Sequence, residues 1–213
     1  MIKLLVWLFL LALLLALSSA IQQPYNEQDA LEYISVASLS YCGTVQKIRN
    51  GECWDATKLT KSYGIDTLYA GNYEAEFSNK IVYVITKQDH KKRIIAGWTG
   101  TRSTEQLLTE GVLSAMTDYD THNVEPDTRA VKYFDKFYDR IRSQYISDLT
   151  KALNQHPDYT LTITGHSLGG ALSMHAAIDC ILGECISEDK LSVYTYGTPR
   201  VGNYKFSRII SER

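Results

Sequence analysis

A serine flanked by glycines offers the clearest chemistry in the chain, in the stretch Gly165-His166-Ser167-Leu168-Gly169-Gly170. Residues 161–164 before it are typical of a strand, and the alanines and leucines after it are typical of a helix. A G-x-S-x-G sequence at a strand-to-helix turn exposes the serine hydroxyl as a nucleophile for acyl transfer. The pentapeptide alone arises by chance, and a glycine-rich turn with an idle serine is the alternative. The setting favours Ser167 as a catalytic nucleophile.

Such a serine needs an oxyanion hole, because negative charge develops on the carbonyl oxygen that it attacks. The backbone N–H of Leu168 lies at the positive end of the following helix and supplies one donor. The loop Trp98-Thr99-Gly100-Thr101-Arg102-Ser103 follows an earlier predicted strand. In this loop Thr101 offers both an N–H and a hydroxyl. We therefore expect Leu168 and Thr101 to hold the oxyanion.

The base that would activate Ser167 is not evident. In a triad built on this kind of elbow, the acid and then the histidine follow the serine along the chain. His175 is the only histidine after Ser167, and eight residues of helix would separate the two by about 12 Å. We expect a structural role for His166, since the elbow turns its side chain away from the serine. The other histidines precede the elbow, in predicted loops or at a helix end: His90, His122 and His156.

The first half of the chain supplies a helix and a pair of strands. Asn26–Ser40 has helical spacing and begins with a capping pattern. Lys80–Thr86 and Arg93–Trp98 are rich in β-branched and aromatic residues, which predicts two strands joined by a polar turn. We expect solvent around the basic residues of this turn: Lys91, Lys92 and Arg93.

The second half of the chain alternates helix and strand. A long helix is predicted, with Asp127 or Thr128 as its N-cap. Its apolar face consists of Val131, Phe134, Tyr138, Ile141, Tyr145, Leu149 and Leu153. Tyr159–Thr164 is a predicted strand, Gly169–Leu182 a helix and Leu191–Tyr196 another strand. The alternation predicts an α/β fold with a mostly parallel sheet and helices on both faces.

The first 20 residues have the pattern of a signal peptide. They hold one charge, Lys3, then an apolar run and small residues that end at Ala20. We expect cleavage after Ala20, so that residues 21–213 form the mature domain of a secreted protein. An uncleaved membrane anchor is the alternative.

Secretion changes the interpretation of the four cysteines, because thiols form disulfides in an oxidising compartment. Three pairings are possible. The local pairing, Cys42–Cys53 with Cys180–Cys185, is favoured because each pair encloses a short loop that contains glycine.

The overall composition is that of one globular domain. The chain has 213 residues, of which 45% are hydrophobic, and its formal net charge is −2. It has no basic surplus that would predict a nucleic-acid partner. We expect neither a metal nor a cofactor, since there is no metal-ligand or nucleotide-binding motif. A calcium loop starting at Asp118 would have Arg129 in place of its final glutamate. The oligomeric state stays open.

Three motifs together resemble the class 3 (fungal-type) lipase family. They are the elbow, the Trp98–Ser103 loop and Tyr196-Gly197-Thr198-Pro199-Arg200-Val201-Gly202-Asn203. The resemblance covers roughly Lys80–Arg213 and implies an α/β-hydrolase that acts on acylglycerols or related esters at a lipid–water interface. It assigns the nucleophile to Ser167 and the oxyanion donors to Leu168 and Thr101. Residues 103–116 correspond to the family's lid.

The same family places its triad acid in a D-x-V-P segment beyond the third motif, and its histidine further on. The sequence reaches Arg213 before either, and neither Asp179 nor Asp189 matches that segment. The resemblance therefore implies a domain whose C-terminal strands and helix are missing. We expect a secreted serine ester hydrolase that works through an acyl-serine intermediate. The alternative is a catalytically inactive lipase-like module that binds lipid or a protein.

Overall fold

The computed structural model describes residues 25–74, 80–100, 115–119, 124–183 and 185–211. Its α-helices are α2 (Glu27–Ser40), α3 (Val45–Arg49), α4 (Trp54–Ser62), α6 (Lys132–Gln155), α7 (Leu168–Leu182) and α8 (Tyr204–Ser211). Its strands are β1 (Asp66–Glu74), β2 (Lys80–Gln88), β3 (Arg93–Trp98), β4 (Met116–Asp118), β5 (Arg129–Val131), β6 (Thr160–His166) and β7 (Leu191–Tyr196).

Three sequence predictions lie wholly or mainly outside the described residues. They are the signal peptide at 1–20, the oxyanion donor Thr101 and the lid segment 103–116, of which only Ala115 and Met116 are described. Met116, the last residue of that segment, begins β4 and pairs with Val131. Within the described ranges, no helix is both long and apolar enough to cross a membrane.

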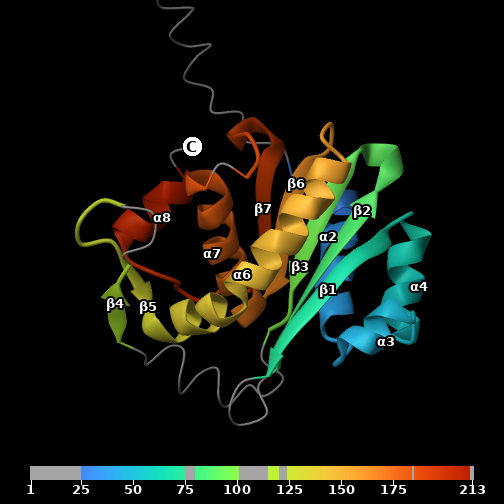
Figure 1. Ribbon diagram of the computed structural model, residues 1–213, viewed down its shortest axis with the longest axis horizontal. Helices are drawn as coiled ribbons and strands as arrows, with labels where there is room; N and C mark the ends of the chain where they lie inside the picture. The colour runs from blue at the N-terminus through green and yellow to red at the C-terminus, as the bar shows by residue number, and fades with distance from the viewer. Residues whose placement is uncertain (1–24, 75–79, 101–114, 120–123, 184, 212–213) are drawn as a thin grey trace, which may run out of the picture.

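A five-stranded sheet in the order β1-β2-β3-β6-β7 forms the centre of the fold (Figure 1). The pairs β1–β2 and β2–β3 are antiparallel, whereas β3–β6 and β6–β7 are parallel. The parallel half contains the strand that leads into the serine turn. The α/β fold class is confirmed, in a mixed sheet.

Both faces of this sheet are covered by helices, with α6 in front and α2 behind in Figure 1. Successive side chains of a strand point to opposite faces. Tyr83 and Ile85 of β2 accordingly belong to the core under α6 and α7, while Val82 and Val84 belong to the core under α2. Because both faces are buried, β2 is an almost continuous apolar run.

The long helix α6 buries the face that its spacing predicts, including Phe134, Tyr138 and Tyr145. The predicted N-cap was wrong. The residue before the helix is Val131, which ends β5 and makes no side-chain cap. The hydroxyl of Thr128 instead donates to the carbonyl of Glu125 in the preceding turn.

The basic turn between β2 and β3 differs from the expectation of solvated charges. Arg93 is buried and forms ion pairs with Asp29 and Glu32 of α2, and Lys91 also pairs with both carboxylates. Burial opposes ionisation of Glu32, but hydrogen bonds from Lys91 and the charge of Arg93 lower its pKa. The turn thus fastens α2 to one end of the sheet.

Local sequence patterns did not predict β1, α3, α4, β4, β5 or α8. The strand β1 contains Gly71 and Asn72, which have low strand propensity, and it forms only by pairing with β2. The structure requires glycine at position 71, because a Cβ there would overlap the ring of Tyr83, its pairing partner on β2.

Both predicted disulfides are present. Cys42–Cys53 connects the end of α2 to the start of α4, with the two Cα atoms 5.5 Å apart. Cys180–Cys185 encloses the end of α7, with the two Cα atoms 4.8 Å apart. Such bonds are typical of proteins that mature in oxidising compartments.

Candidate active site

Ser167 lies in a strained turn between β6 and α7. Its backbone has φ 58° and ψ −122°, a conformation that few residues other than glycine adopt. The backbone N–H of Ser167 donates to the carbonyl of Tyr196 at the end of β7, over 2.9 Å. The side chain is only partly buried. This is the backbone geometry of a nucleophile elbow.

Glycines around Ser167 are required because the elbow is packed against its neighbours. A Cβ on Gly165 would overlap the backbone of Gly169, and a Cβ on Gly169 would overlap the carbonyl of Trp98. On Gly170 it would overlap the side chain of Thr198 in the third motif. The glycines therefore let β6, α7, the end of β3 and the Tyr196–Asn203 segment meet at one point.

Leu168 is the first residue of α7, and a helix offers no internal acceptor to its first N–H groups. This N–H is one predicted oxyanion donor. The end of β3 lies beside the elbow, because Trp98 pairs with Gly165 in parallel register. The loop that leads to Thr101 thus starts next to the elbow, although Thr101 itself is outside the described residues.

Tyr41, which no sequence motif marked as a site residue, also reaches this site. Its hydroxyl lies 3.0 Å from Nδ1 of His166, the residue before the nucleophile. The Gly100 backbone makes a hydrogen bond to the same phenol, opposing the rise in the Tyr41 pKa that burial causes. His166 is hydrogen-bonded, as its expected structural role requires, but its side chain is exposed rather than packed. No spacing signal connects Tyr41 to residues 125 positions away.

The remaining described histidines are not placed to act on Ser167. His90 and His156 lie near the start of β6, where Arg93 pairs with Thr160. The elbow is at the other end of that strand, about 20 Å away. His122 is outside the described residues.

His175 is fully buried on α7, with neither ring nitrogen hydrogen-bonded. Its ring stacks on Tyr138 and also contacts Tyr119 and Phe206. Burial lowers its pKa from 6.5 to about 4, so the ring is neutral in the folded protein. His175 is thus a core residue.

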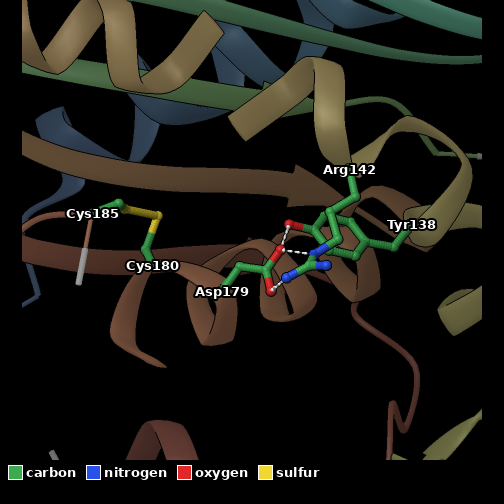
Figure 2. Close-up of a disulfide and its surroundings, with 5 residues drawn as sticks. All are labelled: Tyr138, Arg142, Asp179, Cys180 and Cys185. Carbon is green, nitrogen blue, oxygen red and sulfur yellow. Dashed lines mark hydrogen bonds and ion pairs between the residues drawn. A yellow bond between two sulfur atoms is a disulfide. The ribbon is translucent and has the colours of Figure 1, made fainter. Parts of the chain in front are cut away.

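Asp179 is also buried on α7, and Figure 2 shows two side chains of α6 directed at its carboxylate. The hydroxyl of Tyr138 and Nε of Arg142 each donate to Oδ2 over 2.6 Å, and Nη2 of Arg142 donates to Oδ1 over 3.0 Å. Along α7, Asp179 is about 17 Å from the elbow. This acid ties two helices together beside the Cys180–Cys185 disulfide.

The described side chains contain no group of three or more potential metal ligands. The described part of the site offers a serine hydroxyl, the N–H groups at a helix start and the start of the adjoining loop. Between a parallel strand and a helix, this arrangement defines the α/β-hydrolase class.

The Lipase (class 3) family model matches residues 95–213, more than half of the sequence. The chain belongs to that family. It is 28% identical to a lipase of Rhizopus niveus over 181 residues, which are 84% of this chain and 44% of the relative. A secreted mono- and diacylglycerol lipase A of Penicillium cyclopium is 38% identical over 71 residues, 33% of this chain and 22% of the relative.

The crystal structure of a lipase from Rhizopus microsporus var. chinensis has the same fold, with a TM-score of 0.74 and 26% identity. The similarity covers 87% of this chain and 62% of that one. The chain spans less than half the length of the Rhizopus niveus lipase that it matches.

Proposed function

We propose that this protein is a secreted serine hydrolase that cleaves acylglycerols or related carboxylic esters through an acyl-serine intermediate. The observation that carries the proposal is the positive φ of Ser167 at the β6–α7 junction. Backbone strain of this kind persists where the surrounding structure enforces it, and it clusters at active sites.

In the proposed reaction, Oγ of Ser167 attacks the ester carbonyl carbon and its proton passes to a base. The tetrahedral oxyanion accepts hydrogen bonds from the backbone N–H groups of Leu168 and Thr101. When the intermediate collapses, the alcohol leaves with a proton and the acyl group stays on Ser167. Water then releases the carboxylic acid and regenerates the serine.

Two further observations support the substrate class and the secretion. Lipases similar to this chain include one named for mono- and diacylglycerols, and the two disulfides fit an oxidising compartment. We further propose cleavage of the signal peptide after Ala20, a lid at residues 103–116 and a lipid or small ester as partner, without nucleic acid.

The test is Ser167→Ala in the full-length protein, assayed on p-nitrophenyl butyrate and by labelling with a fluorophosphonate. We expect loss of both turnover and labelling. The matched control is Ser62→Ala, because Ser62 is an exposed serine on α4. Full turnover by the Ser167→Ala variant would overturn the assignment. A wild-type protein that is unreactive in both assays but binds phospholipid vesicles would be the inactive lipid-binding module.

A further inference from the structure

Tyr41 stands at the end of a helix that is fastened at several points. It directly follows α2, and its N–H donates to the carbonyl of Ser38. The next residue is Cys42, whose disulfide to Cys53 fixes the chain there. At the other end of α2, Asp29 and Glu32 pair with the basic turn of the sheet. A side chain on so rigid an element can hold a precise position.

The middle of α2 rests on the sheet without a gap. A Cβ on Gly97 of β3 would lie only 2.9 Å from a methyl group of Val36. The hydroxyl of Tyr196, at the end of β7, donates to the carbonyl of Ala30. The helix is therefore held against the strands that carry the oxyanion loop and the third motif.

The phenol oxygen of Tyr41 is shared by two catalytic segments. A hydroxyl has one hydrogen to donate and two lone pairs to accept with. This oxygen accepts a hydrogen bond from the Gly100 backbone, lies 3.0 Å from Nδ1 of His166 and donates to the His166 carbonyl oxygen over 3.4 Å.

The two partners of Tyr41 stand next to the residues assigned to the reaction. Gly100 precedes Thr101, and His166 precedes Ser167. The three groups are in contact, because a Cβ on Gly100 would overlap both the Tyr41 hydroxyl and the His166 carbonyl.

We propose that Tyr41 is a positioning residue that sets the spacing between the oxyanion loop and the nucleophile elbow. The inference rests on the proposed function and adds a residue to it. Tyr41 does not touch the substrate. Its hydroxyl holds the Gly100 backbone, which directly precedes the proposed donor Thr101, at a fixed distance from the backbone before Ser167.

Loss of this hydroxyl should act on the transition state rather than on substrate binding. Removing one oxyanion donor lowers kcat by about 100- to 1,000-fold in enzymes of known mechanism. A misplaced donor keeps part of its effect. We therefore expect Tyr41→Phe to lower kcat by about 10- to 50-fold, with KM within twofold of the wild type.

The experiment compares wild type, Tyr41→Phe and Tyr25→Phe as full-length proteins acting on p-nitrophenyl butyrate. Tyr25→Phe is the matched control, because it removes the same hydroxyl from a side chain that is 74% exposed. Titration with a fluorophosphonate counts the competent serines, so that a smaller folded fraction is not mistaken for a lower kcat. A kcat for Tyr41→Phe within twofold of wild type would overturn the proposal.

A second measurement does not depend on turnover. Nitrogen-15 NMR of the imidazole rings reports which nitrogen of His166 carries the proton. We expect one dominant tautomer of His166 in the wild type and in Tyr25→Phe, and a mixture of tautomers in Tyr41→Phe. An unchanged His166 spectrum in Tyr41→Phe would overturn the proposed hydrogen bond even if the protein were inactive.

The failure of this proposal is distinguishable from failure of the proposed function. If Ser167→Ala abolishes turnover while Tyr41→Phe keeps it, the hydrolase stands and the role of Tyr41 is wrong. If the wild type hydrolyses no ester, the proposed function fails, and the tautomer of His166 alone decides whether Tyr41 holds the junction.

Discussion

The backbone N–H of Ser167 donates to the carbonyl oxygen of Tyr196 over 2.9 Å, which joins the elbow to the end of the neighbouring strand. Tyr196 begins the third family motif and lies 29 residues after Ser167, so this bond connects the elbow to that motif. It also satisfies the N–H of a residue whose positive φ is costly. The strained turn is thus supported by a strand that follows it in the sequence.

The close packing of Gly170 on Thr198 predicts that Thr198→Ala restores stability lost in Gly170→Ala. Gly170→Ala should lower stability by about 1–3 kcal/mol, because its Cβ would overlap the Thr198 side chain. In the double variant with Thr198→Ala the overlapping oxygen and methyl are gone, and most of the loss should return. Thermal unfolding of both single variants and the double variant measures the coupling.

Gly169→Ala is the contrasting variant, because its Cβ would overlap the backbone carbonyl of Trp98. No side-chain deletion can relieve that overlap, so Thr198→Ala should not rescue it. Equal rescue of both glycine variants would contradict the packing described for the elbow.

His175 predicts a loss of stability in mild acid. Its pKa is lowered from 6.5 to about 4 by burial in the folded state, so below pH 6.5 the unfolded chain takes up the proton first. The contribution of neutral His175 to the free energy of unfolding is therefore fully present above pH 6.5. It falls by about 3 kcal/mol as the pH approaches 4. Urea unfolding between pH 7 and 4.5 should show a shallower loss in His175→Phe than in the wild type.

The control for this prediction is His90→Gln, which changes an exposed histidine. It should keep the pH dependence of the wild type. If His175→Phe also kept it, the buried histidine would not be the group that titrates.

The ion pairs between α2 and the basic turn predict a large cost for removing Arg93. Arg93→Met removes one of the positive charges that stabilise the buried carboxylate of Glu32. It should lower the free energy of unfolding by about 3–5 kcal/mol. Lys87→Met breaks an ion pair with Asp89, a carboxylate that is 55% exposed, and should cost less than about 1 kcal/mol. Chemical denaturation of the two variants tests the difference. Similar costs would mean that the buried pairs contribute no more than a surface pair.

Asp179 is predicted to matter for stability and not for chemistry. Asp179→Asn removes the charge that Arg142 and Tyr138 contact, and should cost about 3 kcal/mol. Its kcat/KM per active serine should stay within twofold of wild type, as should that of Asp189→Asn, which alters an exposed carboxylate. A large fall in kcat with normal stability would instead make Asp179 part of the catalytic machinery.

The sequence by itself determined the elements with strong local patterns. The strand Leu191–Tyr196 and the helix that follows Ser167 agree with their local sequence patterns. The buried face of α6 agrees with the spacing of its apolar residues. The elbow was also predictable, since its glycines are needed within a few residues of the serine.

Only the tertiary structure decided what depends on contacts between distant segments. It buries Arg93 by bringing α2 over the sheet, and it forms β1 by pairing that segment with β2. It also brings Tyr41 to His166, a contact that no local pattern encodes. The physical reason is that a side chain's burial and partners are set by the elements that pack around it, whereas a short sequence window fixes only its own backbone preference.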